Sequence, residues 1–137
     1  MILRNLAAAG IVLGFAMPAW ADTCLVYEPA TVSVIGTLTM AHGYGPPNFG
    51  QDPAHDRKET YGLLTLDRPA CVSGGDNQVN TDVGSIKAFQ LVPDSPGRRI
   101  DRQLLGTRVV VSGTLFHRVS GGHTEVMILY TEIGRAR

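Results

Sequence analysis

The chain of 137 residues contains 12 basic and 12 acidic side chains, so its formal net charge at pH 7 is zero. Proteins that bind nucleic acids usually present a strongly basic face, and this balance therefore argues against a nucleic-acid partner. A chain of this length is sufficient for one small domain with one hydrophobic core.

The first 21 residues have the pattern of a secretory signal peptide. A positive charge at Arg4 precedes an apolar run over residues 6–17, and residues 19–21 (AWA) fit the A-x-A cleavage pattern. We expect cleavage between Ala21 and Asp22. The alternative, a membrane anchor, is disfavoured because a spanning helix needs roughly twenty apolar residues. The mature form is therefore expected to be periplasmic or secreted and to have no membrane span.

Five segments of the remaining chain have the pattern of β-strands. Residues 31–40 alternate apolar and polar side chains, and Gly36 interrupts the apolar face, which indicates a bulge or a close backbone approach. Further strands are expected over residues 59–66, 85–92, 107–117 and 123–133. The fourth segment repeats the pattern V-x-V-x-G-T-L of the first, with Gly113 in the place of Gly36. We interpret the repeat as the same bulge geometry used in two strands rather than as a gene duplication.

The segment DSPGRRIDRQLLG, residues 94–106, is the one candidate for a helix. Ile100 and Leu104 are at helical spacing and Gly106 is a suitable stop, which predicts a short helix of two turns. Its RRIDR run, residues 98–102, is a local basic patch, and a solvated helix face is the usual explanation of such a run.

The order β-β-β-α-β-β predicts an all-β fold with one short helix. It is the order of a five-stranded OB-like barrel, in which a bulged first strand bends to serve both sheets. A plain β-sandwich and an SH3-like barrel are the alternatives. We expect residues 22–137 to form this single domain.

The two cysteines, Cys24 and Cys71, predict one disulfide in an oxidising compartment. Cys24 precedes the first predicted strand and Cys71 follows the second. If these strands are antiparallel neighbours, the two cysteines lie side by side. A catalytic thiol is the alternative, but no C-x-x-C motif or paired histidine stands near either cysteine.

All four histidines flank two predicted connections. His42 and His55 bracket the connection between the first two strands, and His117 and His123 bracket the connection between the last two. In an OB-type barrel these connections emerge at the same end and flank the usual ligand face. We therefore expect the four histidines to gather at one rim.

Three interpretations of the histidines remain open. Neutral imidazoles would suit a zinc or copper site, although neither an H-x-H nor an H-E-x-x-H motif occurs. A binding rim would combine them with Tyr44, Phe49 and Arg118 to contact a protein or small ligand. They could instead be turn residues that face water. An odd-length turn between His117 and His123 would put both side chains on one face, and an even-length turn would separate them.

No pattern in the chain supports catalysis, since neither a G-x-S-x-G motif nor a phosphate-cradling glycine loop occurs. The preferred hypothesis is an exported binding module that is not an enzyme and carries no cofactor. Its rim would contact a protein or small-molecule partner through His42, Tyr44, Phe49, His55, His117, Arg118 and His123. The alternative is a periplasmic metal-binding protein that uses the four histidines for zinc or copper.

Four blocks of the sequence resemble a family of small exported bacterial proteins, domain of unknown function 4431. These blocks are CLVYEPATVSVIGTL, GPPNF, ETYGLLTLDRPACV and LLGTRVVVSGTLFHRVSGGHTEVMI. The resemblance covers nearly the whole mature chain and implies a bacterial origin and a periplasmic or secreted location. The hairpin HRVSGGH, with Arg118 and Gly122, is poorer in histidine than this hairpin often is in the family, which weakens the metal interpretation. The family implies no activity.

Overall fold

The computed structural model describes residues 23–75 and 77–137. The expected signal peptide and its cleavage site at Ala21 and Asp22 lie outside the described residues. The elements are β1 (Leu25–Val26), β2 (Thr31–Tyr44), β3 (Lys58–Ser73), β4 (Val83–Pro93), the 3₁₀ helix η1 (Arg102–Leu104), β5 (Arg108–His117) and β6 (Val126–Arg135). The predicted all-β class is confirmed. β1 is a short additional strand that the sequence pattern did not predict.

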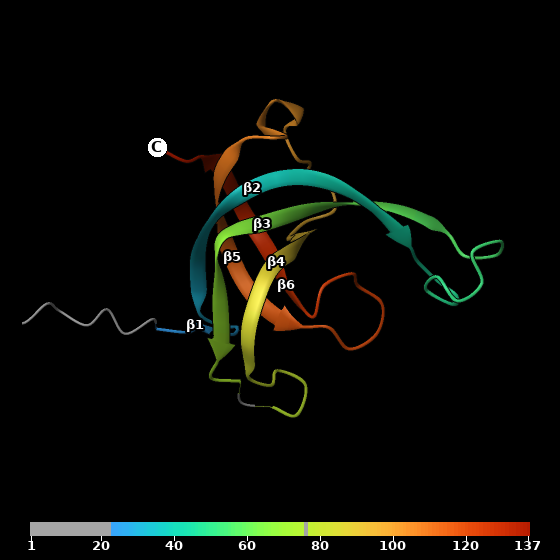
Figure 1. Ribbon diagram of the computed structural model, residues 1–137, viewed down its shortest axis with the longest axis horizontal. Helices are drawn as coiled ribbons and strands as arrows, with labels where there is room; N and C mark the ends of the chain where they lie inside the picture. Colours follow the sequence, from blue (N-terminus) through green and yellow to red (C-terminus); the bar gives the residue numbers. More distant parts are fainter. Residues whose placement is uncertain (1–22, 76) are drawn as a thin grey trace, which may run out of the picture.

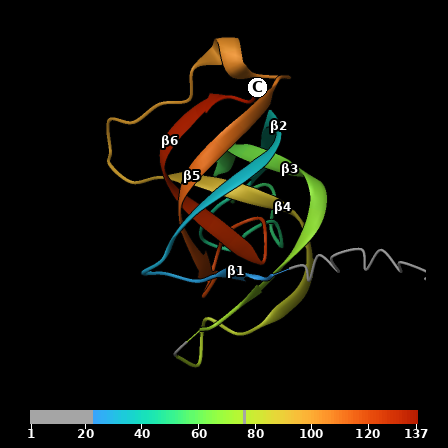
Figure 2. The ribbon, with the colours of Figure 1, turned by 90° about the vertical axis from the view of Figure 1, so that its left-hand side faces the viewer.

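The six strands form one sheet in the order β1-β3-β2-β5-β6-β4, and β3 also pairs with β4. Most of the pairings are antiparallel, whereas β4 and β6 are parallel. β2 serves two neighbours in succession, because it pairs with β5 over Thr31–Thr37 and with β3 over Gly36–Tyr44. The β4–β5 connection with η1 and the β3–β4 connection lie at opposite ends of the molecule (Figures 1 and 2).

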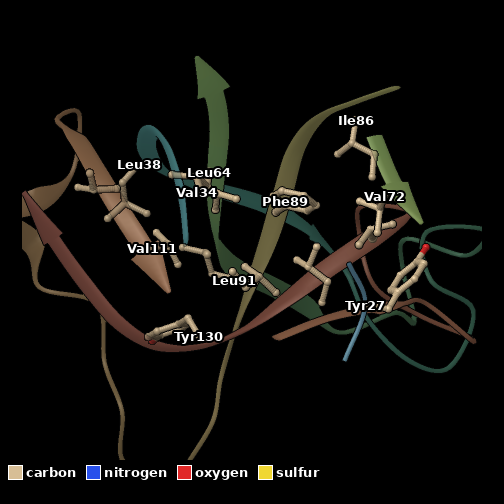
Figure 3. Close-up of a cluster of buried hydrophobic side chains, with 14 residues drawn as sticks. Tyr27, Val34, Leu38, Leu64, Val72, Ile86, Phe89, Leu91, Val111 and Tyr130 are labelled. Atoms are coloured by element: carbon tan, nitrogen blue, oxygen red, sulfur yellow. The ribbon is translucent and has the colours of Figure 1, made fainter. Parts of the chain in front are cut away.

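The core lies between the strands, where side chains from β2 to β6 point into a common interior (Figure 3). Alternation in β2 explains this arrangement: Val34 and Leu38 are buried, whereas Thr37 and Thr39, between and beyond them, are exposed. Tyr27, in the β1–β2 connection, closes one side of the core and donates a hydrogen bond from its hydroxyl to the Thr81 carbonyl at 2.6 Å. Its buried ring therefore keeps its polar atom satisfied.

Both glycines of the repeated pattern lie at close backbone approaches, as expected. A Cβ at Gly36 would overlap the Thr65 carbonyl, with its carbon 2.8 Å away, and a Cβ at Gly113 would lie 2.9 Å from the Leu129 carbonyl carbon. The β5–β6 register shifts beside Gly113, where Thr131 is the additional residue. No shift accompanies Gly36 in its two ladders, since β2 changes partner there instead. The repeat therefore marks close approach rather than one common bulge.

The prediction of a two-turn helix is wrong. η1 covers only Arg102–Leu104, and Leu105 already has extended backbone angles. The Asp101 side chain caps the Gln103 N–H at 2.9 Å, while the Gly106 N–H donates to the Leu38 carbonyl at 2.7 Å. Tertiary bonds to β2 therefore end the helical turn before a second one forms. Gly106, at φ 75°, provides the predicted stop.

The predicted disulfide between Cys24 and Cys71 is confirmed, with a Cα–Cα distance of 4.7 Å. Next to it, β1 runs parallel to the end of β3, where Leu25 pairs with Val72. The disulfide thus links the start of the described chain to the end of β3. This agrees with the prediction that the strands now labelled β2 and β3 are antiparallel neighbours.

Candidate functional site

The end of β2 and the start of β3 extend together past the other strands and form an arm, defined here as residues 41–61 (Figure 1). The two strands pair with each other up to Tyr44 and Lys58. β4 pairs with β3 only from Gly62 onwards, where Gly62 lies opposite Leu91. Within the described residues, the strands of the arm therefore pair only with each other.

The connection at the tip of the arm, residues 45–57, is organised around the Asp56 carboxylate. Asp56 is only 7% exposed and accepts hydrogen bonds from the N–H groups of Asn48 (2.7 Å), Gly50 (2.7 Å) and Asp52 (3.2 Å). Burial raises the pKa of this carboxyl, but the N–H donors outweigh that effect and leave the pKa below its ordinary value. The sequence analysis did not identify this role, for which an acidic residue in a Gly- and Pro-rich segment is the only signal.

The second connection of the predicted rim, residues 118–125, is longer than the tight turn that the sequence suggested. The β5–β6 ladder ends at the pair His117 and Val126, so the prediction that the last strand begins at His123 is wrong. The physical reason is hydrogen bonding to β4: the His123 N–H donates to Gln90 Oε1 at 2.7 Å, and Thr124 Oγ1 accepts from the Gln90 N–H at 2.9 Å. The odd-or-even test of the turn therefore does not apply.

His123 attaches this connection to the arm. Its ring stacks on Tyr61 with 4.1 Å between centroids and 2° between planes, and its Nε2 lies 3.3 Å from Glu59 Oε2. Gly43 leaves room for the ring, because a Cβ there would lie 2.6 Å from His123 Nδ1. A π-stack together with a carboxylate partner fixes both the plane and the direction of the imidazole.

Phe49 forms a direct contact between the two connections. A Cβ at Gly121 would lie 2.7 Å from Phe49 Cε1, so the ring rests against the Gly121 backbone. Phe49 has φ 51° and is still 47% exposed. A Cβ at Gly50 would lie 3.5 Å from Tyr44 Cδ2, so the Tyr44 ring lies next to Gly50. The structure thus brings Phe49 and His123 together in the rim, defined as residues 45–57 and 118–125. Tyr44 follows Gly43, which faces His123, so strand alternation places the Tyr44 side chain on the opposite face of the arm.

Each of the other three histidines has a partner of its own. His42 shares a hydrogen bond with Thr60 Oγ1 at 3.1 Å and, by strand alternation, lies on the face of the arm opposite to His123. His55 lies 2.8 Å from Asp52 Oδ2 and its side chain is 77% exposed. His117 contacts Glu125 Oε1 at 3.3 Å, next to the exposed Arg118. Over residues 23–75 and 77–137, no group of three His, Cys, Asp or Glu residues is placed to hold a metal.

Two hollows adjoin the arm. The smaller, of about 380 Å³, lies beside His42, Tyr44 and Lys58. The larger is a groove of about 930 Å³ that runs between the start of β3, the end of β4 and the β4–β5 connection. The sequence analysis identified the basic run that borders this groove but not the groove itself.

The described part of the chain has no helix that is long and apolar enough to cross a membrane. No curated protein and no solved structure matches the chain. A family model matches residues 88–133, a stretch that includes η1, β5 and parts of β4 and β6. Over these residues the chain matches the family described as Domain of unknown function (DUF4431), as the resemblance predicted.

Proposed function

We propose that the protein is an exported binding module without enzymatic activity and that the rim is its contact surface for a protein or small-molecule partner. The observation that carries the proposal is the docking of the two rim connections onto each other through Phe49 and Gly121, together with the stack of His123 on Tyr61 of the arm. A surface that is ordered before binding loses less conformational entropy when a partner arrives. Phe49, at 47% exposure, and Val119, at 81%, supply apolar area on it.

The finer description of the fold belongs to the same proposal. The pairings lead from β2 through β3, β4, β6 and β5 back to β2, a circuit that supports an OB-like barrel of five strands. In such a barrel the rim flanks the usual ligand face. The Cys24–Cys71 disulfide supports export, because disulfides persist in oxidising compartments.

Metal binding by the histidines remains the alternative proposal. Three histidine–carboxylate pairs support it: His55 with Asp52 at 2.8 Å, and His117 with Glu125 and His123 with Glu59, each at 3.3 Å. Zinc or copper would need further ligands at any of these pairs. Calorimetric titration of the purified protein separates the two proposals: heat at micromolar zinc or copper favours the metal site, and no heat contradicts it.

Partner capture with rim variants tests the preferred proposal. Phe49→Ala and Val119→Ala remove apolar area from the rim, whereas Ile35→Ala removes an apolar side chain of similar exposure to Phe49, 41%, from β2. We expect a pull-down partner of the wild type to be retained by Ile35→Ala and lost by the two rim variants, with unchanged thermal unfolding. Retention of the partner by both rim variants would contradict the proposal.

A further inference from the structure

One edge of β3 is free along the arm. β3 pairs with β2 through Lys58, but its ladder with β4 ends at the pair Gly62 and Leu91. Beyond Leu91, β4 continues beside β6, where Pro93 pairs with Tyr130. The two strands therefore diverge, and no described strand occupies the space between them.

The backbone groups that face this space can be assigned from the end of the arm. The Arg57 carbonyl accepts from the Gly45 N–H at 2.6 Å, and the Arg57 N–H donates to the Pro46 carbonyl at 3.0 Å, so both groups point toward β2. Neighbouring residues in a strand direct their backbone groups to opposite edges. Those of Lys58 and Thr60 consequently point toward the free edge.

The groove of about 930 Å³ lies along this edge. Gly62 and Leu91 close its inner end, and Ile100, from the β4–β5 connection, packs directly over Gly62. The Tyr130 side chain also lines the groove. The result is an open channel with an apolar floor and a strand edge along one wall.

The charge of the groove is strongly positive. Four arginines line it, Arg57, Arg98, Arg99 and Arg102, whereas Glu59 is the only acidic residue among the described residues of the lining. Arg57 lies 3.6 Å from Glu59, and Arg98 forms an ion pair with Asp94 just outside the groove. Arg99 and Arg102 are exposed and form no ion pair with any described residue, so both guanidinium groups are open to a ligand.

We propose that the groove binds an extended acidic peptide segment of a protein partner, which adds as a strand to the free edge of β3 with its carboxylates against Arg99 and Arg102. Strand addition supplies main-chain hydrogen bonds, and guanidinium–carboxylate pairs supply charge-assisted ones. Residues 58–61 span about 13 Å at roughly 3.3 Å per residue, enough for about four residues of peptide. A peptide fits better than a small anion because only a peptide backbone matches the repeat of the edge.

This proposal concerns the edge of β3 and not the rim, so the two proposals can fail separately. The probe is a random dodecapeptide library displayed on phage and selected on the purified protein at low salt. We expect the selected peptides to be enriched in Asp and Glu. Selected peptides without such an excess would overturn the proposal.

A synthetic copy of the most enriched peptide then tests the site by fluorescence anisotropy. The charge-reversal variant Arg99→Glu/Arg102→Glu should raise its Kd at least about tenfold, since it replaces two attractive pairs by repulsion. The matched control Arg68→Glu/Lys87→Glu reverses two charges that do not line the groove and should leave the Kd unchanged. Equal Kd values for the two double variants would overturn the proposal.

The strand-addition step has its own control, a peptide of the same sequence with alternate residues N-methylated. Because N-methyl groups remove the main-chain donors and keep the carboxylates, we expect this peptide to bind at least about tenfold more weakly. Equal binding would show attraction by charge alone and contradict strand addition. Phe49→Ala should leave the affinity for the unmodified peptide unchanged, which separates this site from the rim.

Discussion

Two segments of β3 have different surroundings although they belong to one strand. Residues 62–66 lie in the body, defined here as the described residues outside the arm, where Leu64 is fully buried and paired on both edges. Residues 58–61 lie in the arm and pair with β2 alone. The body thus has the buried apolar area that stabilises folding, whereas we propose that the arm presents side chains and backbone groups to a partner. Changes in the body should therefore alter stability, and changes in the arm should alter binding.

The largest effect is expected from removing the disulfide of the body. The double substitution Cys24→Ser/Cys71→Ser frees a loop with a sequence separation of 47 residues. Loss of this link should lower the free energy of unfolding by about 4 kcal/mol, because the unfolded chain regains loop entropy. Urea unfolding of both proteins measures the difference. A loss below about 1 kcal/mol would show that β1 and β3 hold together without the link.

A smaller loss is expected at the close approach in β2. Gly36→Ala places a Cβ onto the Thr65 carbonyl, and since that obstacle is backbone, the strands must move apart. We expect about 3 kcal/mol of destabilisation by thermal or urea unfolding. Gly84→Ala is the matched control, because its Cβ would meet nothing within 4 Å. If both variants unfolded alike, the close approach would not explain the glycine.

The contact between body and arm should contribute still less. His123→Ala removes the stack on Tyr61 and the contact with Glu59, which we expect to cost about 1 kcal/mol of unfolding free energy. His55→Ala is the matched control, since its side chain is 77% exposed, and its effect should stay within about 0.5 kcal/mol. A larger loss for His55→Ala than for His123→Ala would contradict the attachment of the rim through His123.

The smallest effect is a local one, at the tip of the arm. The pKa of Asp56 is lower in the folded protein than its unfolded value of 3.8, so this carboxylate stabilises the tip at higher pH. That contribution is complete above the unfolded pKa and is lost as the pH falls through the folded pKa. NMR titration of the Asn48, Gly50 and Asp52 amides should give a midpoint below 3.8. A midpoint above 3.8 would contradict the hydrogen-bonded carboxylate.

Strand alternation predicted the body well because burial in a sheet follows the two-residue period of the strand. Val34 and Leu38 face the core as expected, and the cysteines meet because the predicted neighbours pair. The sequence pattern failed where hydrogen bonds to distant segments override the local preference of the chain. The Leu38 carbonyl ends the turn at η1, and Gln90 keeps His123 out of β6.

The candidate site was less predictable because it depends on where strands diverge. The run that contains Arg99 and Arg102 is visible in the sequence, but its position beside a free strand edge follows from the end of the β3–β4 ladder at Gly62. The sequence analysis correctly expected His123 and Phe49 to lie near each other, because it assigned them to neighbouring connections. It also grouped His42 with His123, although one residue along a strand changes the face and His42 lies on the opposite face of the arm.

Amide hydrogen exchange within β3 tests the distinction between body and arm most directly. Thr60 and Leu64 direct their backbone groups to the same edge, where Leu64 has Phe89 of β4 as its partner and Thr60 has no described strand. We predict that the Thr60 amide is protected roughly 100-fold less than the Leu64 amide in the free protein. Equal protection of the two amides would show that the edge is covered, and would contradict the account of the arm as a binding surface.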